Sequence, residues 1–381
     1  MGLTSGALLA LLVLVAIGLG ATTIWYWPRF AGAGIRMVLA RIGLFAGAQF
    51  TLLMVLLLAV NNYFLFYASW SDLLGTNHQP VHIQANNLIA AKPKGTGKPL
   101  ARQATSFDKK KPDPAHDGQI EQVQIQGART GLTTQAYVFL PPQYFQKPFE
   151  KHHFPVMYDF TGFPGLPQQL VTRLKVPSTA AAEMIAGRIQ PMIIVMMRPS
   201  PTSVMPKDTE CTDVPGGPQV LSFYTQDVAE ALLSTYRVAT SPHAWGAMGD
   251  STGGYCAVKL AMKASDRFTA AVSMAGYFYP RQDWQTGDLY AGSKQVKNDN
   301  SLIWRLQHLP PPPISVLITT SPDGERDFGE ARKFLQAARA PLATDKILVP
   351  GGGHNPRTWR RVLPSALLWM SKHLQPEPQA G

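Results

Sequence analysis

Two long runs of apolar side chains occupy roughly the first sixty residues of the chain. The run from Ala7 to Trp27 contains no charged residue, and the run from Met37 to Tyr67 contains only Arg41, near its start. About twenty apolar residues are enough for a helix to cross the hydrocarbon core of a bilayer. The pattern therefore predicts two transmembrane helices, at about 7–27 and 37–60.

The charges around these runs predict the orientation of the helices in the membrane. A cleaved signal peptide is a poorer interpretation of the first run, because residues 1–5 carry no Lys or Arg and the apolar stretch is too long. The loop between the runs carries Arg29 and Arg36. The positive-inside rule places this loop in the cytoplasm, so the rest of the chain is expected outside the cytoplasm, beside the cell membrane.

After these runs, apolar segments rich in β-branched residues alternate with segments of helical periodicity. Strands are predicted at 121–127, 134–140, 154–160, 192–197, 244–248, 269–274, 314–320 and 346–349. Helices between them are predicted at 220–236, 253–264, 329–338 and 358–374. Such alternation is typical of a mostly parallel sheet covered by helices on both faces. The sequence thus predicts an α/β fold with eight strands.

Composition divides the chain into four parts. Residues 91–117 are rich in Lys, Pro, Gly and Ser/Thr and lack apolar periodicity, which is typical of a tether. The predicted parts are a membrane anchor at 1–70, a juxtamembrane segment and linker at 71–117, the α/β domain at 118–374, and a flexible tail at 375–381.

The net charge of +11 raises the question of nucleic-acid binding. The basic residues are scattered, and their densest cluster, Lys109–Lys111, lies in a Pro- and Asp-containing stretch rather than on a helix. No nucleic-acid partner is therefore expected, and weak attraction to an anionic lipid or polymer surface explains the charge better. The partners expected instead are a lipid bilayer, contacted through the N-terminal helices, and a small-molecule or lipid ester.

The chain has two cysteines, Cys211 and Cys256. Neither has another Cys or His at metal-ligand spacing, so no metal site is predicted. Outside the cytoplasm the two could form a disulfide between a loop and the helix after residue 253, but two buried free thiols explain them equally well.

A Gly-x-Ser-x-Gly motif lies between a predicted strand and a predicted helix. It reads Gly249-Asp250-Ser251-Thr252-Gly253. In this strand–turn–helix context the motif indicates a nucleophile elbow, because residues two before and two after the serine are too crowded for side chains. Ser251 is the predicted nucleophile.

A serine hydroxyl needs a base, and in this fold the acid and then the histidine follow the serine along the chain. His354 follows the last predicted strand and a run of three glycines, so it is the predicted base. His308 and His373 lie on helix-like segments and are expected to be ordinary surface or capping residues. The acid should follow the strand at 314–320, where the candidates are, in order of preference, Asp323, Glu325 and Asp327.

The oxyanion that forms during attack needs two backbone amides. Thr252, directly after the nucleophile, supplies the first. The second should come from the loop after the third strand, which reads Thr161-Gly162-Phe163-Pro164-Gly165. We expect the amide of Phe163, because Gly162 before it permits close approach, although an ordinary Gly/Pro turn is the alternative for this loop.

Longer strings of the sequence point to one family. The first set comprises Met157-Tyr158-Asp159-Phe160-Thr161-Gly162-Phe163, the segment 249–255 and the segment 351–355. These resemble the esterase D and mycolyltransferase-like branch of the α/β-hydrolases, over roughly 123–374. The resemblance implies the α/β-hydrolase fold, a serine esterase or acyltransferase activity without metal or organic cofactor, and an oxyanion hole formed by Phe163 and Thr252.

A second set of strings is more specific. It comprises Asn61-Asn62-Tyr63, Trp70-Ser71-Asp72-Leu73-Leu74-Gly75, Glu210-Cys211-Thr212-Asp213-Val214-Pro215-Gly216-Gly217-Pro218 and His354-Asn355-Pro356-Arg357-Thr358-Trp359. These resemble membrane-anchored esterases of actinobacteria, which implies a site facing the cell envelope. The mycolyltransferases themselves carry a Met after the nucleophile and are secreted, whereas this chain has Thr252 and an anchor.

The sequence thus leads to three functional hypotheses. The first is hydrolysis of carboxylic esters through an acyl-enzyme at Ser251. The second is transfer of the acyl group to an envelope sugar or lipid, which differs only in the acceptor. The third is a hydrolase-fold scaffold without catalysis, which the intact nucleophile, base and glycines disfavour.

Overall fold

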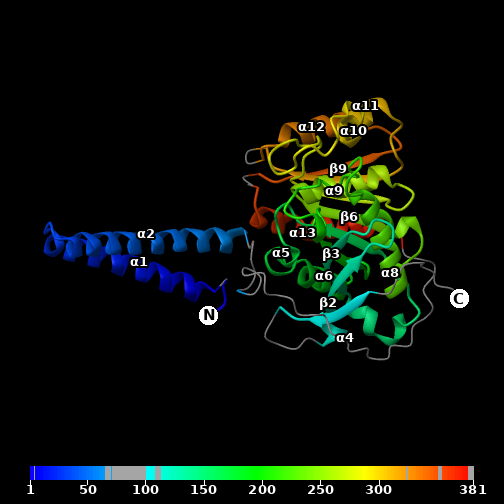
Figure 1. Cartoon of the computed structure of the whole chain (residues 1–381). Coiled ribbons are helices and arrows are strands. Elements are labelled where there is room, and N and C mark those ends of the chain that lie inside the picture. Colours follow the sequence, from blue (N-terminus) through cyan, green and yellow to red (C-terminus); the bar gives the residue numbers. More distant parts are fainter. Residues whose placement is uncertain are drawn as a thin grey trace. The chain divides into compact units, whose positions relative to one another are not determined.

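The computed structural model describes residues 1–3, 5–64, 70, 100–107, 113–322, 325–350 and 354–375 (Figure 1). The chain divides into two compact units, residues 1–80 and 81–381. Most of the predicted linker and nearly all of the predicted tail lie outside the described residues.

The first unit contains two long helices, drawn in blue in Figure 1. They are α1 (Gly6–Tyr26) and α2 (Ile35–Phe64), joined through the short helix η1 (Trp27–Phe30). Both are long and apolar enough to cross a membrane, and almost none of their side chains is buried within the chain. They lie where the apolar runs predict them, although α2 continues beyond residue 60.

The second unit is built on a nine-stranded sheet with the order β1-β2-β3-β5-β4-β6-β7-β8-β9. Its strands are β1 (Ala101–Thr105), β2 (Gln119–Gln126), β3 (Thr133–Leu140), β4 (Val156–Phe160), β5 (Ile193–Met197), β6 (Trp245–Asp250), β7 (Ala270–Met274), β8 (Ser315–Thr320) and β9 (Ala343–Leu348). The pairs β1–β2, β2–β3 and β3–β5 are antiparallel, and the remaining pairs are parallel. This mostly parallel sheet confirms the predicted α/β-hydrolase fold.

Helices cover both faces of the sheet (Figure 1). Residues of α5 (Gln168–Thr172), α6 (Val176–Ile185) and α13 (Pro356–His373) belong to the core of one face, and residues of α8 (Ala229–Thr235), α9 (Thr252–Lys263), α11 (Leu302–His308) and α12 (Phe328–Ala337) belong to the core of the other. Along β4, Tyr158 and Phe160 join the α9 side while Met157 joins the α13 side. Burial of both faces explains why the central strands are apolar at nearly every position.

The apolar pattern does not predict β1, which lies within the expected tether together with the short helix α4 (Pro114–Asp117). The strand pairs with β2 from Ala101 opposite Gln124 to Thr105 opposite Ile120. An edge strand needs only main-chain hydrogen bonds to one neighbour, so it can form without the alternation that marks a half-buried strand.

The predicted helix at 220–236 differs from a regular helix. It consists of α7 (Val220–Ser222), a π-helical segment η5 (Phe223–Val228) and α8. At the opposite edge from β1, β9 is exposed along much of its length and pairs only with β8 in the described sheet.

Candidate active site

Ser251 lies at a sharp turn between β6 and α9, with φ 53° and ψ −122°. Its backbone N–H donates to the carbonyl of Met274, at 2.9 Å, which ties the turn to β7. A Cβ on Gly249 would lie 2.4 Å from the carbonyl carbon of Gly253, and a Cβ on Gly253 would lie 2.1 Å from the carbonyl oxygen of Phe160. A side chain at either position would force the surrounding backbone to move, as expected for a nucleophile elbow.

His354 meets Ser251 across this turn. Its Nε2 lies 2.9 Å from the Ser251 Oγ, within hydrogen-bonding distance. The histidine directly precedes Asn355, whose side-chain oxygen accepts the backbone N–H groups of Arg357 and Thr358 and so caps α13. The imidazole is therefore held at the start of a packed helix, and the structure brings the predicted nucleophile and base together.

Glu325 is the carboxylate that contacts the imidazole. Its Oε2 lies 2.7 Å from the Nδ1 of His354, and only 3% of its side chain is exposed. Asp327 forms an ion pair with Arg281, at 2.5 Å. Asp323, the first choice from the sequence, lies outside the described residues.

The surroundings of His354 favour its protonated form. Partial burial lowers the pKa of the imidazole, but the hydrogen bond to Glu325 and the negative charges of Glu325, Asp250 and Asp327 outweigh that effect, so the pKa is raised above 6.5. This arrangement would stabilise an imidazolium at His354.

The loop at 161–165 lies against the nucleophile. A Cβ on Gly162 would lie 3.0 Å from the Cβ of Ser251, and the Gly162 N–H donates to the Asp250 carboxyl at 2.9 Å. Because the Gly162 N–H already donates to Asp250, the next backbone N–H in the loop that is a candidate oxyanion donor is that of Phe163. On the other side of the turn, Thr252 is the first residue of α9, a position at which a helix leaves its N–H without an intrahelical acceptor.

Two buried carboxyl groups lie beneath this site and do not figure in the sequence-based prediction. Burial raises the pKa of Asp250 to about 7, although the Gly162 N–H and the charge of His354 partly oppose the shift. Asp159 on β4 is fully buried, and burial together with the charge of Asp250 raises its pKa well above 3.8. Acidic residues within otherwise apolar strand segments are the sequence signal for both.

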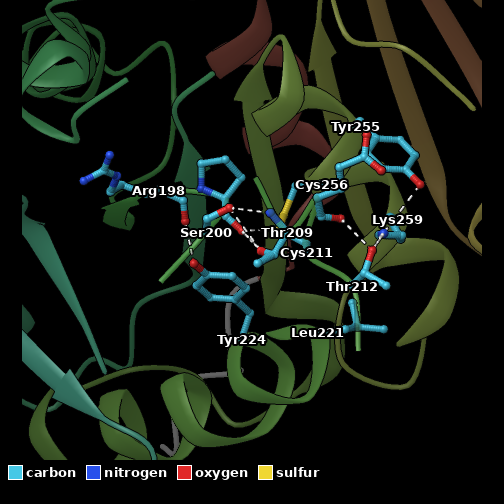
Figure 2. The surroundings of a disulfide bond; sticks show 12 residues. Arg198, Ser200, Thr209, Cys211, Thr212, Leu221, Tyr224, Tyr255, Cys256 and Lys259 are labelled. Atoms are coloured by element: carbon cyan, nitrogen blue, oxygen red, sulfur yellow. Dashed lines mark hydrogen bonds between the residues drawn. A yellow bond between two sulfur atoms is a disulfide. The ribbon is translucent and has the colours of Figure 1, made fainter. Parts of the chain in front are cut away.

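A disulfide joins α9 to the loop that follows β5 (Figure 2). Cys211 and Cys256 are bonded, with their Cα atoms 5.6 Å apart and a sequence separation of 45. Of the two alternatives that the sequence leaves open, the structure has the disulfide. Beside it, the Lys259 ammonium donates to the Thr212 hydroxyl at 2.9 Å and to the side-chain oxygen of Asn300 at 3.0 Å.

The residue before this disulfide, Glu210, is fully buried in a hydrogen-bond network. It accepts from the hydroxyl of Tyr277 at 2.7 Å, from the backbone N–H of Arg281 at 2.9 Å and from the hydroxyl of Tyr290 at 3.1 Å. The network contacts the helix that begins after Ser251, because the Tyr277 ring stacks on that of Tyr255 in α9, with 4.7 Å between the ring centroids. Glu210 does not figure in the sequence-based prediction of the site.

The two other histidines weighed from the sequence make local contacts. The Nδ1 of His308 lies 2.8 Å from the carbonyl of Trp304 on α11, and the Nδ1 of His373 lies 2.8 Å from the carbonyl of Trp369 on α13. Each therefore bonds its own helix, one turn earlier. In the part of the chain that the structure describes, no three His, Cys, Asp or Glu residues gather as a metal site would require.

Comparisons with known proteins agree with this architecture. The family model described as "Putative esterase" matches residues 127–372. No curated protein matches the sequence significantly.

Solved structures show the same fold. A ferulic acid esterase superimposes with a TM-score of 0.58 at 18% identity, over 68% of this chain and 99% of its own. An S-formylglutathione hydrolase from Agrobacterium tumefaciens gives a TM-score of 0.58 at 13% identity, over 73% and 100%. The fluorophosphonate-binding serine hydrolase F of Staphylococcus aureus gives 0.52 at 15% identity, over 67% and 98%.

Proposed function

Because this chain belongs to the esterase family, we propose that it is a serine esterase that hydrolyses carboxylic esters through an acyl-enzyme on Ser251. One observation carries the proposal: His354 lies within hydrogen-bonding distance of Ser251 through one ring nitrogen and of Glu325 through the other. This is the geometry that serine hydrolases require of nucleophile, base and orienting acid.

The first half of the reaction forms the acyl-enzyme. The Ser251 Oγ attacks the ester carbonyl while its proton moves to the Nε2 of His354, and the Glu325 carboxylate stabilises the resulting imidazolium. The carbon–oxygen bond of the leaving alcohol then breaks, and His354 returns the proton to that alcohol. We assign the backbone amides of Thr252 and Phe163 to the oxyanion, because the Gly162 amide is held by Asp250.

The second half releases the acid. A water molecule gives a proton to His354 and attacks the acyl carbon, and the same proton then returns to Ser251 as the acid leaves. If an alcohol of a sugar or lipid takes the place of water, the product is a new ester. Transfer and hydrolysis thus share every protein group named above.

We further propose that α1 and α2 anchor the enzyme in the cell membrane, with the catalytic unit outside the cytoplasm. The apolar side chains of these helices are almost entirely unburied within the chain, which suits lipid contact. The loop between them carries Arg29 and Arg36, which favour the cytoplasmic side. A disulfide in the catalytic unit also suits an oxidising compartment.

Labelling with a fluorophosphonate probe tests the catalytic proposal. The detergent-solubilised wild-type chain should gain one probe adduct at Ser251 and should hydrolyse a short 4-nitrophenyl ester, whereas S251A should do neither. S178A, which removes an exposed hydroxyl on α6, is the matched control and should behave as wild type. Folded wild-type protein that takes up no probe would leave only the scaffold hypothesis.

Product analysis separates the two catalytic alternatives. With a 4-nitrophenyl ester and an added alcohol, mass spectrometry of the products measures the ratio of new ester to free acid. We expect mainly acid; a predominance of new ester at low alcohol concentration would make the chain an acyltransferase.

A further inference from the structure

A cavity of about 610 Å³ opens between the end of α5 and the first turns of α13. Its lining residues are Thr172, Arg173, Pro356, Arg357, Arg360 and Arg361. Both walls continue segments of the proposed active site: Pro356 follows His354 by two residues, and α5 follows the loop that carries Phe163. The cavity therefore lies on chain segments that continue from the proposed active site, and its volume is typical of ligand pockets.

The lining of this cavity is strongly basic, although it includes the first turns of a helix. Arg357, Arg360 and Arg361 lie one, four and five residues after Pro356, so they share one face of α13. All three are exposed, and none forms an ion pair with the part of the chain that the structure describes. With the fourth arginine across the cavity, at position 173, the lining carries four guanidinium groups.

The helix itself disfavours these arginines. The N-terminus of a helix carries partial positive charge, so acidic residues stabilise the first turn and basic residues destabilise it. The first turn of α13 contains no acidic residue, yet Arg357 lies in it and Arg360 and Arg361 follow directly. An anion bound in the cavity would reverse this repulsion, because it would interact favourably with both the guanidinium groups and the helix terminus.

We propose that this cavity binds a phosphate or carboxylate group of the ester substrate, so that the enzyme acts on anionic esters. The proposal rests on the esterase function and adds a substrate class to it. Planar guanidinium groups bind phosphate and carboxylate oxygens in pairs, which fixes the position as well as the charge of the ligand. A substrate held there by its anionic end would present its ester carbonyl to Ser251.

Two esters of the same length test the substrate class. The substrates are 4-nitrophenyl pentanoate, which is neutral, and the mono-4-nitrophenyl ester of glutaric acid, which ends in a carboxylate. For the wild-type chain in neutral detergent we expect a higher kcat/KM with the anionic ester. In R360Q/R361Q, the ratio of the two kcat/KM values should fall at least tenfold, mainly through KM of the anionic ester.

The matched control is R332Q/K333Q, which removes two exposed positive charges from α12, away from the cavity. It should keep the wild-type ratio. An equal loss on both esters in R360Q/R361Q, or an unchanged ratio, would overturn the proposal. A change that appears only in vesicles of anionic lipid, and equally with both esters, would instead assign the arginines to the membrane surface.

A binding measurement keeps this inference separate from the proposed chemistry. Phosphate binding is measured by titration calorimetry on S251A, because binding can be measured without catalysis. The measurement is repeated on S251A chains that also carry either R360Q/R361Q or R332Q/K333Q. We expect phosphate binding that the cavity substitutions weaken at least tenfold and the control pair leaves unchanged. If the wild-type chain hydrolyses neither ester, this titration alone decides: binding lost in the cavity variant supports the anion site, and equal or absent binding in all variants overturns it.

Discussion

At the scale of single residues, the acid of the proposed triad is distinguished by its contacts rather than by its position in the sequence. Asp323, Glu325 and Asp327 follow β8 at alternate positions. Glu325 has its side chain almost fully buried against His354, whereas Asp327 is held by Arg281. We therefore expect Glu325 to orient the base.

The substitution E325Q tests this assignment. It should lower kcat by about 10³- to 10⁴-fold, because the amide neither stabilises the imidazolium nor fixes the tautomer that accepts the serine proton. Wild-type kcat/KM should rise with pH through the raised pKa of His354, since only the neutral imidazole is a base. Loss of the Glu325 charge lowers that pKa, so the acid limb of the profile should move to lower pH.

The same pH profiles of D323N provide the comparison. We expect this variant to keep its activity within about threefold and its acid limb unchanged. A large loss in D323N with a nearly normal E325Q would transfer the role to Asp323 and contradict the contact seen for Glu325.

Gly253 offers a second test at this scale. In G253A the new Cβ would meet the Phe160 carbonyl oxygen at 2.1 Å, so the elbow or β4 must move. We expect a loss of about 3 kcal/mol in the free energy of unfolding, which corresponds to a fall of roughly 6 to 12 °C in the thermal midpoint.

G329A on α12 is the control, because no atom lies within 4 Å of the Cβ it would add. Its midpoint should stay level or rise slightly, as alanine favours a helix over glycine by about 1 kcal/mol. Equal midpoints for the two variants would show that the elbow tolerates a side chain at residue 253.

Local steric rules explain why some residues could be predicted and others could not. Ser251 could be predicted because a single sharp turn requires glycine two residues before and two residues after it. His354 could be predicted from its place after the last strand. The choice of Glu325 over Asp323 depends on which side chain reaches a ring more than twenty residues away, and no local pattern records that. Glu210 likewise becomes significant only when Tyr277 and Tyr290 fold onto it.

At the scale of elements, the disulfide connects α9, which begins directly after Ser251, to the loop that carries Glu210. The bond closes 45 residues of chain, and loop-closure entropy for that length corresponds to about 4 kcal/mol. Removing it should therefore lower the free energy of unfolding by an amount of this order.

The variant C211A/C256A tests this role. Its thermal midpoint in detergent should fall well below that of the wild-type chain, in keeping with the lost cross-link. A reductant should lower the midpoint of the wild-type chain and leave that of the variant unchanged. A variant as stable as wild type under oxidising conditions would show that packing alone fixes the loop.

The elements themselves were predicted unevenly. The central strands could be located because burial on both faces makes them continuous apolar runs, as in Ile193–Met197. Strand β1 could not, because its Arg102 and Gln103 follow no such pattern and its stability comes from main-chain pairing with β2. The π-helical segment η5 could not be predicted either, because the apolar pattern of this stretch is that of an ordinary α-helix.

At the scale of the whole molecule, the proposed membrane anchor would determine on which side of the membrane the proposed esterase meets its substrate. C-terminal fusions test the proposed orientation in cells. An alkaline phosphatase fusion, which is active only outside the cytoplasm, should be active, and a green fluorescent protein fusion exported through the same route should stay dark. R29Q/R36Q should reduce the phosphatase signal per molecule, because it weakens the positive-inside bias.

The opposite result, a fluorescent and phosphatase-inactive pair, would place the catalytic unit in the cytoplasm. The arginine cavity could then still bind an anion, since its chemistry does not depend on the compartment. The disulfide, by contrast, would face a reducing environment.

The exposed last strand, β9, bears on whether copies of this protein in the same membrane associate through their sheet edges. Proteins anchored in one bilayer diffuse in two dimensions and collide often, and an open strand edge invites a neighbour to extend the sheet. On β9, Asp345 and Lys346 are exposed on opposite faces of the strand, and a joining strand would have to strip water from both charges. Crowded copies of this chain should therefore stay separate, each with its own site open to substrate.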